Sequence, residues 1–263
     1  MRLFRRKAGP PDAAAAMSRV LIFKYQIVTG MATPPPDVLA GLMQAWDPGE
    51  RQRFLEESRQ RQAESEKKLR DSGLWPAMTP NEQEFIRALP SDVTQQMLIN
   101  VSWLMESAEC LLWSLGLVDA LPPYDAQADL NHLKRVPSSS IQELLRNAKL
   151  RPSDVISKAR DAAELWHWRS RTRQIQESGE PVQLPDGLRL SKVVQMSAEK
   201  AASDGLFGVP LGDDFPAFGR PYRDISSDEW SQATSIAMER HKAFNWLCGY
   251  APGNRWDDTP TDT

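Results

Sequence analysis

Residues 91–116 read SDVTQQMLINVSWLMESAECLLWSLG, and this stretch decides the fold. Its large apolar residues recur every three or four positions, at Val93, Met97, Val101, Leu104, Ala108, Leu111 and Leu115. This period is that of an α-helix with one broad apolar face, and Gly116 is a typical helix terminator. The opposite side carries Trp103, Glu106, Cys110 and Trp113, so we expect that side to be covered as well. The sequence therefore predicts a central core helix over residues 91–115.

Helical periodicity recurs along the rest of the chain, and no segment shows the alternation that marks a strand. We expect helices over residues 13–28, 37–44, 48–71, 80–89, 91–115, 126–134, 139–147, 152–176, 188–203 and 227–248. The fold class predicted is all-α, with residues 13–263 forming a single compact multi-helix domain that ends in an ordered tail. Residues 1–12 are predicted to be a disordered N-terminal extension.

The overall composition argues against several classes of protein. The 263 residues carry 32 Lys and Arg against 35 Asp and Glu, a net charge of −3, which argues against nucleic acid or an anionic membrane as partner. Only two cysteines occur, so reduced thiols are expected in place of a disulfide framework. Asp12, Arg19 and Lys24 interrupt any apolar core of a signal peptide. We expect a cytoplasmic protein with no cofactor.

Arg240 is the most informative single residue near the end of the chain. On a helical wheel it shares a face with Ala233, Ala237, Phe244 and Leu247, which places a guanidinium on the apolar side. A buried arginine requires a carboxylate partner, because an unpaired buried charge is very costly. The predicted partner is Glu106 or one of the tail acids Asp257, Asp258 and Asp262. We favour an ion pair that clamps the tail, and the alternative is an arginine that binds an anionic ligand.

Other polar residues supply candidates for catalysis. Glu106 lies between Trp103 and Trp113, and a carboxyl in an aromatic pocket has the raised pKa of a general acid, unless an arginine pairs with it. His241 and Asn245 are one helical turn apart and could face a ligand together, although a satisfied structural histidine is the commoner case. The candidate catalytic set comprises Glu106, Glu239, Arg240, His241, Asn245, Asp257 and Asp258.

The i, i+3 spacing of Glu164 and His167 is used twice in carboxylate-bridged di-iron bundles, but it occurs once here. Arg160 and Arg171 continue the same helix face, so a solvated, salt-bridged stripe is the favoured interpretation. Metal binding at Glu164 and His167 stays the minor alternative, and no metal is expected elsewhere.

Several late motifs together carry a family resemblance. They are Leu-Leu-Trp-Ser-Leu-Gly-Leu-Val (111–118), Leu-Pro-Pro-Tyr-Asp (121–125), Leu-Trp-His-Trp (165–168), Phe-Gly-Arg-Pro-Tyr (218–222), Glu-Arg-His-x-x-x-Asn-Trp-Leu (239–247) and Trp-Asp-Asp-x-x-Thr-Asp-Thr (256–263). With these motifs the chain resembles the bacterial family known as domain of unknown function 4272, from about residue 17 onward, although the polar segment 48–71 departs from the family pattern. The resemblance implies a compact helical cytosolic protein and brings no catalytic residues.

Two functions are expected from this sequence. The first is a non-enzymatic role through contacts with another protein or through self-association, as in an accessory or immunity-type protein. It predicts an exposed apolar patch on the 204–223 segment or on the polar 48–71 helix. The alternative is an enzyme or a small-anion-binding protein, with a polar pocket around Glu106, Arg240 and the C-terminal aspartates.

Overall fold

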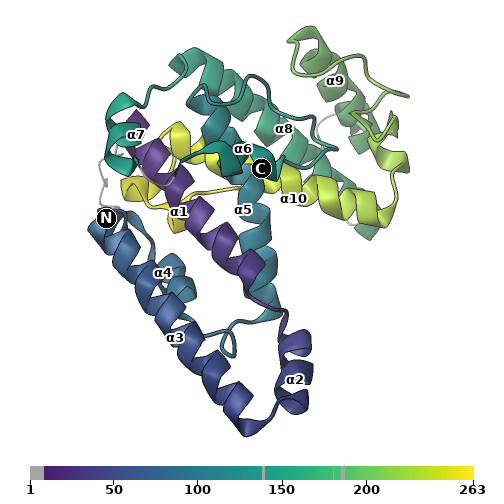
Figure 1. The fold of residues 1–263 in the computed structure, drawn as a ribbon. Helices are drawn as coiled ribbons and strands as arrows, with labels where there is room; N and C mark the ends of the chain where they lie inside the picture. Colours follow the sequence, from purple (N-terminus) through teal and green to yellow (C-terminus); the bar gives the residue numbers. More distant parts are fainter. Residues whose placement is uncertain (1–8, 138–139, 180, 185–186) are drawn as a thin grey trace, which may run out of the picture.

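The computed structural model describes residues 9–137, 140–179, 181–184 and 187–263. Ten α-helices lie within them (Figure 1). Their bounds are α1 Ala13–Ala32, α2 Pro36–Ala45, α3 Pro48–Asp71, α4 Pro80–Arg87, α5 Gln95–Ser114, α6 Leu130–Arg135, α7 Ile141–Asn147, α8 Ser153–Ser178, α9 Leu190–Ser203 and α10 Ser227–Leu247. The all-α prediction is confirmed, and the helix predicted over 139–147 begins at Ile141, with residue 139 outside the described residues.

The central helix α5 begins four residues later than the apolar spacing predicted. Thr94 accepts a hydrogen bond from the Met97 amide on its hydroxyl and so caps the helix, because a threonine at this position satisfies a free N–H group. At the other end Gly116 has a φ of +70°, and the amide of Leu117 donates to the Leu112 carbonyl. Glycine adopts this left-handed conformation without strain, so the predicted helix end is confirmed.

The main core lies where α1, α5 and α10 pack together, with α8 running along α10 (Figure 1). Its largest buried side chains include Phe23, Leu111, Phe244 and Trp256. A second apolar cluster forms around Trp166, between α8, α9, α10 and the segment that precedes α10. Because α8 and α10 contribute to both clusters, they tie the two together.

Helices α2 and α3 extend away from this body as an arm (Figure 1). The 24 residues of α3 bury only Ser58 and Leu69, and i, i+4 ion pairs such as Lys67–Asp71 line the exposed surface. Asp47 and Glu50 form a capping box at the start of α3, and Pro48 is the first residue of the helix. The bounds predicted for this helix, 48–71, are confirmed, and these local interactions fix its start.

A small sheet lies in the segment before α10, where the sequence shows no strand alternation. Strands β1 (Pro216–Ala217) and β2 (Arg220–Pro221) form a small antiparallel hairpin. Phe218 and Gly219, at its turn, both have positive φ, as a two-residue hairpin turn of type I′ requires. The Phe218 amide donates to Asp125 at 2.6 Å, which holds the turn. Each strand has only two residues, too few to show a strand alternation in the sequence.

The N-terminal segment that was predicted to be disordered is partly described. Residues 1–8 lie outside the described residues. Pro11 is buried, and the backbone of Gly9 and Pro10 lies against Gly249, where a side chain would meet the Pro10 nitrogen at 2.9 Å. The predicted extension is therefore packed on the body from residue 9. None of the described helices combines the length and apolar character that crossing a bilayer demands.

Candidate functional site

Arg240 is buried, as predicted, and its partner is Glu106. The guanidinium donates from Nε at 3.0 Å and from Nη2 at 2.8 Å to the same carboxylate oxygen, Oε2 of Glu106. It also donates to the backbone carbonyls of Pro122, Pro123 and Ala126. The amide of Ala128 donates to the other Glu106 oxygen at 2.8 Å. This cluster fixes the 122–128 segment against α5 and α10.

The geometry corrects both expectations that placed a ligand at this cluster. Arg240 is fully buried and Glu106 is 2% exposed, and every nitrogen of the guanidinium donates to a protein oxygen. An anion would have to displace one of these partners, because no donor is left over. The tail aspartates make no contact with Arg240, so the predicted Arg240 clamp on the tail is wrong.

The tail is held by its tryptophan and its backbone. Trp256 is 2% exposed and packs edge-on against Phe23 and Trp246, with ring centroids 4.9 Å and 5.8 Å apart. The Asn245 amide donates to the Pro260 carbonyl at 2.8 Å. Apolar burial and one backbone hydrogen bond therefore dock the chain end onto α1 and α10. Asp258 contacts Arg255 at the surface and faces no site.

His241 and Asn245 belong to a buried polar chain that also includes His167. Nδ1 of His241 lies 3.2 Å from Nδ1 of His167, and its Nε2 lies 2.8 Å from Nδ2 of Asn245. The Asn245 oxygen accepts from Nε of Arg160 at 2.9 Å. The structure thus joins the two histidine motifs of the sequence, which lie 74 residues apart.

The direction of these bonds assigns the histidine protons. Because the Asn245 oxygen accepts from Arg160, its amide nitrogen donates to Nε2 of His241. A neutral His241 then carries its proton on Nδ1 and donates it to His167. Burial lowers the pKa of His241 to about 4 and lowers that of His167 below its usual range. Both rings are therefore neutral at pH 7, and the donor and acceptor roles in this series of hydrogen bonds require neutral rings.

The metal alternative at Glu164 and His167 is not supported by their partners. Glu164 accepts from Arg160 at 2.6 Å, whereas His167 is 5% exposed and turned to His241. The prediction of a solvated stripe is thus wrong for His167. The described residues contain no group of three or more His, Cys, Asp or Glu side chains that could hold a metal ion.

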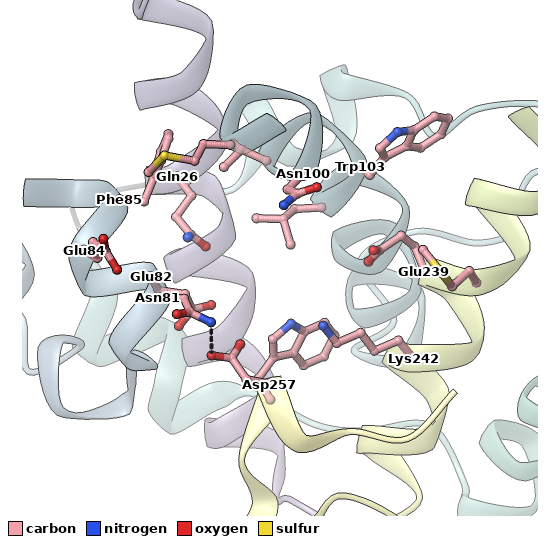
Figure 2. Close-up of a pocket in the computed structure, with 15 residues that line it drawn as sticks. Gln26, Asn81, Glu82, Glu84, Phe85, Asn100, Trp103, Glu239, Lys242 and Asp257 are labelled. Atoms are coloured by element: carbon pink, nitrogen blue, oxygen red, sulfur yellow. Dashed lines mark hydrogen bonds between the residues drawn. The ribbon is translucent and has the colours of Figure 1, made fainter. Parts of the chain in front are cut away.

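Two other candidates, Glu239 and Asp257, line a groove of about 540 Å³ between α1, α4, α5, α10 and the tail, which we call the central groove (Figure 2). Its other polar lining residues include Gln26, Asn81, Glu82, Glu84, Asn100 and Lys242. Phe85, Trp103, Trp256 and several aliphatic side chains complete the walls. The sequence candidates are therefore split: Glu239 and Asp257 line this groove, Glu106 and Arg240 form the closed cluster, His241 and Asn245 belong to the buried polar chain, and Asp258 lies at the surface.

One wall of the central groove is rigidly held. Arg19 binds both oxygens of Glu82 at 2.7 Å and also donates to the Ala77 carbonyl. Glu82 accepts in addition from the Thr79 amide, as part of the capping box of α4. Asn81 on the same turn donates to Asp257 at 3.0 Å, which joins the tail to α4 (Figure 2).

Glu239 lies on the opposite wall, on α10. Ser107 on α5 donates to its carboxylate at 2.8 Å. Burial raises the pKa of Glu239, and the nearby Lys242 ammonium partly opposes this rise. Lys242 itself rests over the Trp256 ring, 5.1 Å from the centroid, a favourable cation–π contact. The tail thus contributes to both the shape and the charge of the groove.

Gln26 gives the central groove its most unusual feature. This side chain on α1 is 3% exposed, and its Oε1 has no hydrogen-bond partner. In Figure 2 its amide points toward Asn81 and Glu82. Buried acceptors are nearly always paired, and an unpaired one commonly marks a position where a further molecule donates a bond.

Sequence reasoning missed Gln26 because its local context looks apolar. Arg19 and Gln26 are seven residues apart on α1 and are both buried, so they share its inward face. Two polar residues on a buried stripe were the available signal. The acidic and amide side chains of α4 and α5 gave none, since exposed polar residues are ordinary on helices.

Comparison with protein families adds the last observation. The family described as Domain of unknown function (DUF4272) matches residues 49–195, more than half of the chain. The chain belongs to this family. No curated protein and no solved structure matches it. The family resemblance predicted from the sequence is confirmed.

The DUF4272 match has a different extent from the expected one. It begins inside the polar segment 48–71, which had been taken to depart from the family pattern, and it ends at residue 195. It therefore includes α4 and α5 of the central groove with Asn81, Glu84, Asn100 and Trp103. The α10 and tail motifs that carried much of the resemblance lie beyond it.

Proposed function

We propose that this DUF4272 protein binds a small organic molecule in the central groove. One observation carries the proposal: a buried acceptor, Gln26 Oε1, has no partner and lies in the wall of a groove of about 540 Å³. Ligand sites commonly have volumes of about 300–1,000 Å³ and combine apolar walls with a few placed polar groups. Trp103 and Phe85 supply the apolar walls, and the carboxylates and amides supply the polar groups.

The walls are preorganised, which favours binding. Glu82 is fixed by Arg19, Asp257 by Asn81, and Glu239 by Ser107, so a ligand would not have to order them. The tail is part of the groove only because Trp256 is docked on α1 and α10. The packed tail therefore forms one wall of the site.

Three probes with one skeleton test the proposal: phenethylamine, 2-phenylethanol and phenylacetate. At least one should shift the amide resonances of Gln26 and Asn100 and the indole resonance of Trp103 in heteronuclear NMR spectra of the full chain. Asn100→Trp, which places a large side chain in the groove, should abolish the shifts. Ser102→Trp, on the same helix but outside the groove, should leave them intact. Absence of any shift from all three probes would contradict the proposal.

A role through protein contacts is the second candidate. The two surfaces on which the sequence predicted an exposed apolar patch do not favour it. Helix α3 is charged, and in the described 204–223 segment a single large aliphatic side chain, Val209, is exposed. What favours it is a group of exposed apolar side chains at the end of α1 and on α2, namely Val28, Met31, Val38 and Leu42.

Self-association through this surface is testable by light scattering over a range of protein concentrations. A molar mass that rises with concentration in the wild type, and stays monomeric in Val38→Asp/Leu42→Asp, would support it. A constant monomer mass for the wild type would remove self-association from consideration.

A further inference from the structure

The charges that line the central groove are unbalanced. Among the described lining residues four carboxylates occur, on Glu82, Glu84, Glu239 and Asp257, with Lys242 as the one cationic side chain. Arg19 neutralises Glu82 in a buried ion pair, with side chains about 6% exposed on both sides. The remaining three acids outnumber Lys242, whose ammonium is in addition engaged with the Trp256 ring. A cleft of one charge sign concentrates ions of the opposite sign.

No arginine is among the described residues that line this groove. The Arg19 Nη1 and Nη2 groups donate to Glu82 and to the Ala77 carbonyl, its Nε is buried without a partner, and Arg240 is enclosed elsewhere with Glu106. An anionic ligand would therefore meet carboxylates and would lack the bidentate partner that carboxylate and phosphate groups usually find.

The unpartnered Gln26 oxygen independently points to a donor. This oxygen can only accept a hydrogen bond, and it is shielded from solvent water in a residue that is 3% exposed. An ammonium group carries three N–H donors and no acceptor, so it satisfies this oxygen without leaving a new unpaired atom. A hydroxyl could donate as well, but it would leave the excess negative charge of the groove uncompensated.

The groove also offers apolar surface beside its polar part. Its lining includes Met97, Leu104 and the half-buried Trp103 of α5, together with Met238 of α10. A hydrocarbon or aromatic skeleton would be buried there, and a cation close to an indole face gains a further attraction.

We infer that the ligand of the central groove is an organic ammonium ion, a primary amine on an aromatic or aliphatic skeleton. Gln26 receives the ammonium group, Asp257 and Glu239 on opposite walls supply the negative charge, and Trp103 packs on the skeleton. This inference rests on the proposed binding function and assigns the class of ligand.

The same three probes separate the class of ligand from binding as such, because they differ mainly in charge. At pH 7 phenethylamine is a cation, 2-phenylethanol is neutral and phenylacetate is an anion. We expect the dissociation constant of phenethylamine, measured by isothermal titration calorimetry, to be about tenfold lower than that of 2-phenylethanol, with phenylacetate weakest.

Variants in which amides replace the groove carboxylates test whether charge causes the preference. Glu239→Gln/Asp257→Asn should reduce the preference for the amine over the alcohol to about twofold or less, because amides keep the shape and remove the charge. Asp258→Asn, one residue along the tail and outside the groove, should keep the full preference. Melting temperatures of the variants close to that of the wild type would show that the fold is retained.

Two outcomes would overturn the inference in distinguishable ways. If 2-phenylethanol or phenylacetate binds as tightly as the amine while shifting the Gln26 and Trp103 resonances, the groove binds ligands but not cations in particular. If none of the probes shifts these resonances, the binding function and the inference both fail.

Discussion

Polar side chains inside this protein differ in how completely they are hydrogen-bonded. Arg240 donates five bonds to the Glu106 carboxylate and three carbonyls, whereas Gln26 keeps an open acceptor. A completed network stabilises a fold, while an incomplete one lowers stability unless a ligand completes it. Arg240 is therefore structural, and Gln26 is one of the buried residues whose hydrogen bonding is incomplete, the one that lines the central groove.

Gln26→Leu should separate stability from binding. Leucine removes a buried acceptor that has no partner, so the free protein should be as stable as the wild type or more stable by about 1–3 kcal/mol. Binding of the amine probe should weaken at the same time. Urea unfolding and calorimetry measure the two effects, and a strongly destabilised variant would show that Gln26 has a structural role.

Arg240→Met should be strongly destabilising, by about 3–5 kcal/mol in urea unfolding, because it leaves the Glu106 carboxylate buried without its counter-ion. The matched control is Arg61→Met on α3, where Arg61 and Glu57 are both more than 60% exposed and 3.7 Å apart. That exposed pair should contribute about 0.5 kcal/mol or less. Equal effects at the two sites would contradict the assignment of Arg240.

At the scale of elements, the tail (residues 256–263) forms one wall of the central groove and is held on α1 and α10 by Trp256. Trp256→Ala should lower the free energy of unfolding by about 3–5 kcal/mol, since it empties a site between Phe23 and Trp246. Deleting residues 256–263 should have a similar or slightly larger effect. Asp257→Ala/Asp258→Ala should have a small effect, and a loss as large as that of Trp256→Ala would restore the idea of an ion-pair clamp.

The contact between α8 and α10 should give the protein a pH dependence. His241 has a folded-state pKa of about 4 against an ordinary value of 6.5, so the unfolded chain binds a proton more readily than the folded one. The stabilisation is fully present above pH 6.5 and is lost as the pH falls toward 4, in total on the order of 3 kcal/mol. His167, with its lowered pKa, acts in the same direction.

His241→Gln should flatten this dependence, because glutamine keeps polar contacts without a titrating ring. Val209→Ala, at a residue that is 81% exposed and carries no titrating group, should leave the slope between pH 6.5 and 4 unchanged. Unfolding measured at several pH values checks both variants. A slope that is the same in the wild type and in His241→Gln would show that the histidine pair does not resist protonation.

At the scale of the whole molecule, two apolar clusters share α8 and α10. Tyr124 packs against both clusters and stacks on Trp166 with centroids 5.1 Å apart. We therefore predict one cooperative unfolding transition, consistent with a single domain. Tryptophan fluorescence and far-ultraviolet circular dichroism should give the same midpoint, and two separate midpoints would mean that the Trp166 cluster unfolds independently.

The helices could be predicted from sequence because their signals are local. Asp47-Pro48 and Thr79-Pro80 mark helix starts, Gly116 marks an end, and apolar residues at three- and four-residue spacing give the buried faces. Arg240 was correctly placed in the interior for the same reason. These inferences need only the geometry of one helix.

The partners and the site could not be predicted in this way, because they join distant segments. Arg240 meets Glu106 across 134 residues, and His241 meets His167 across 74. A helical wheel shows that Arg240 is buried but does not show which carboxylate faces it. The central groove depends on α1, α4, α5, α10 and the tail together, so no single stretch carries its pattern.

By itself, the sequence determined an all-α protein of the DUF4272 family with a buried arginine and a packed chain end, since periodicity, caps and motifs are properties of neighbouring residues. Only the tertiary structure decided that Glu106 encloses Arg240, that Trp256 docks the tail, and that Gln26 is left unpaired beside excess carboxylates. The physical reason is that charge balance and hydrogen-bond satisfaction depend on which surfaces meet, and packing alone sets that.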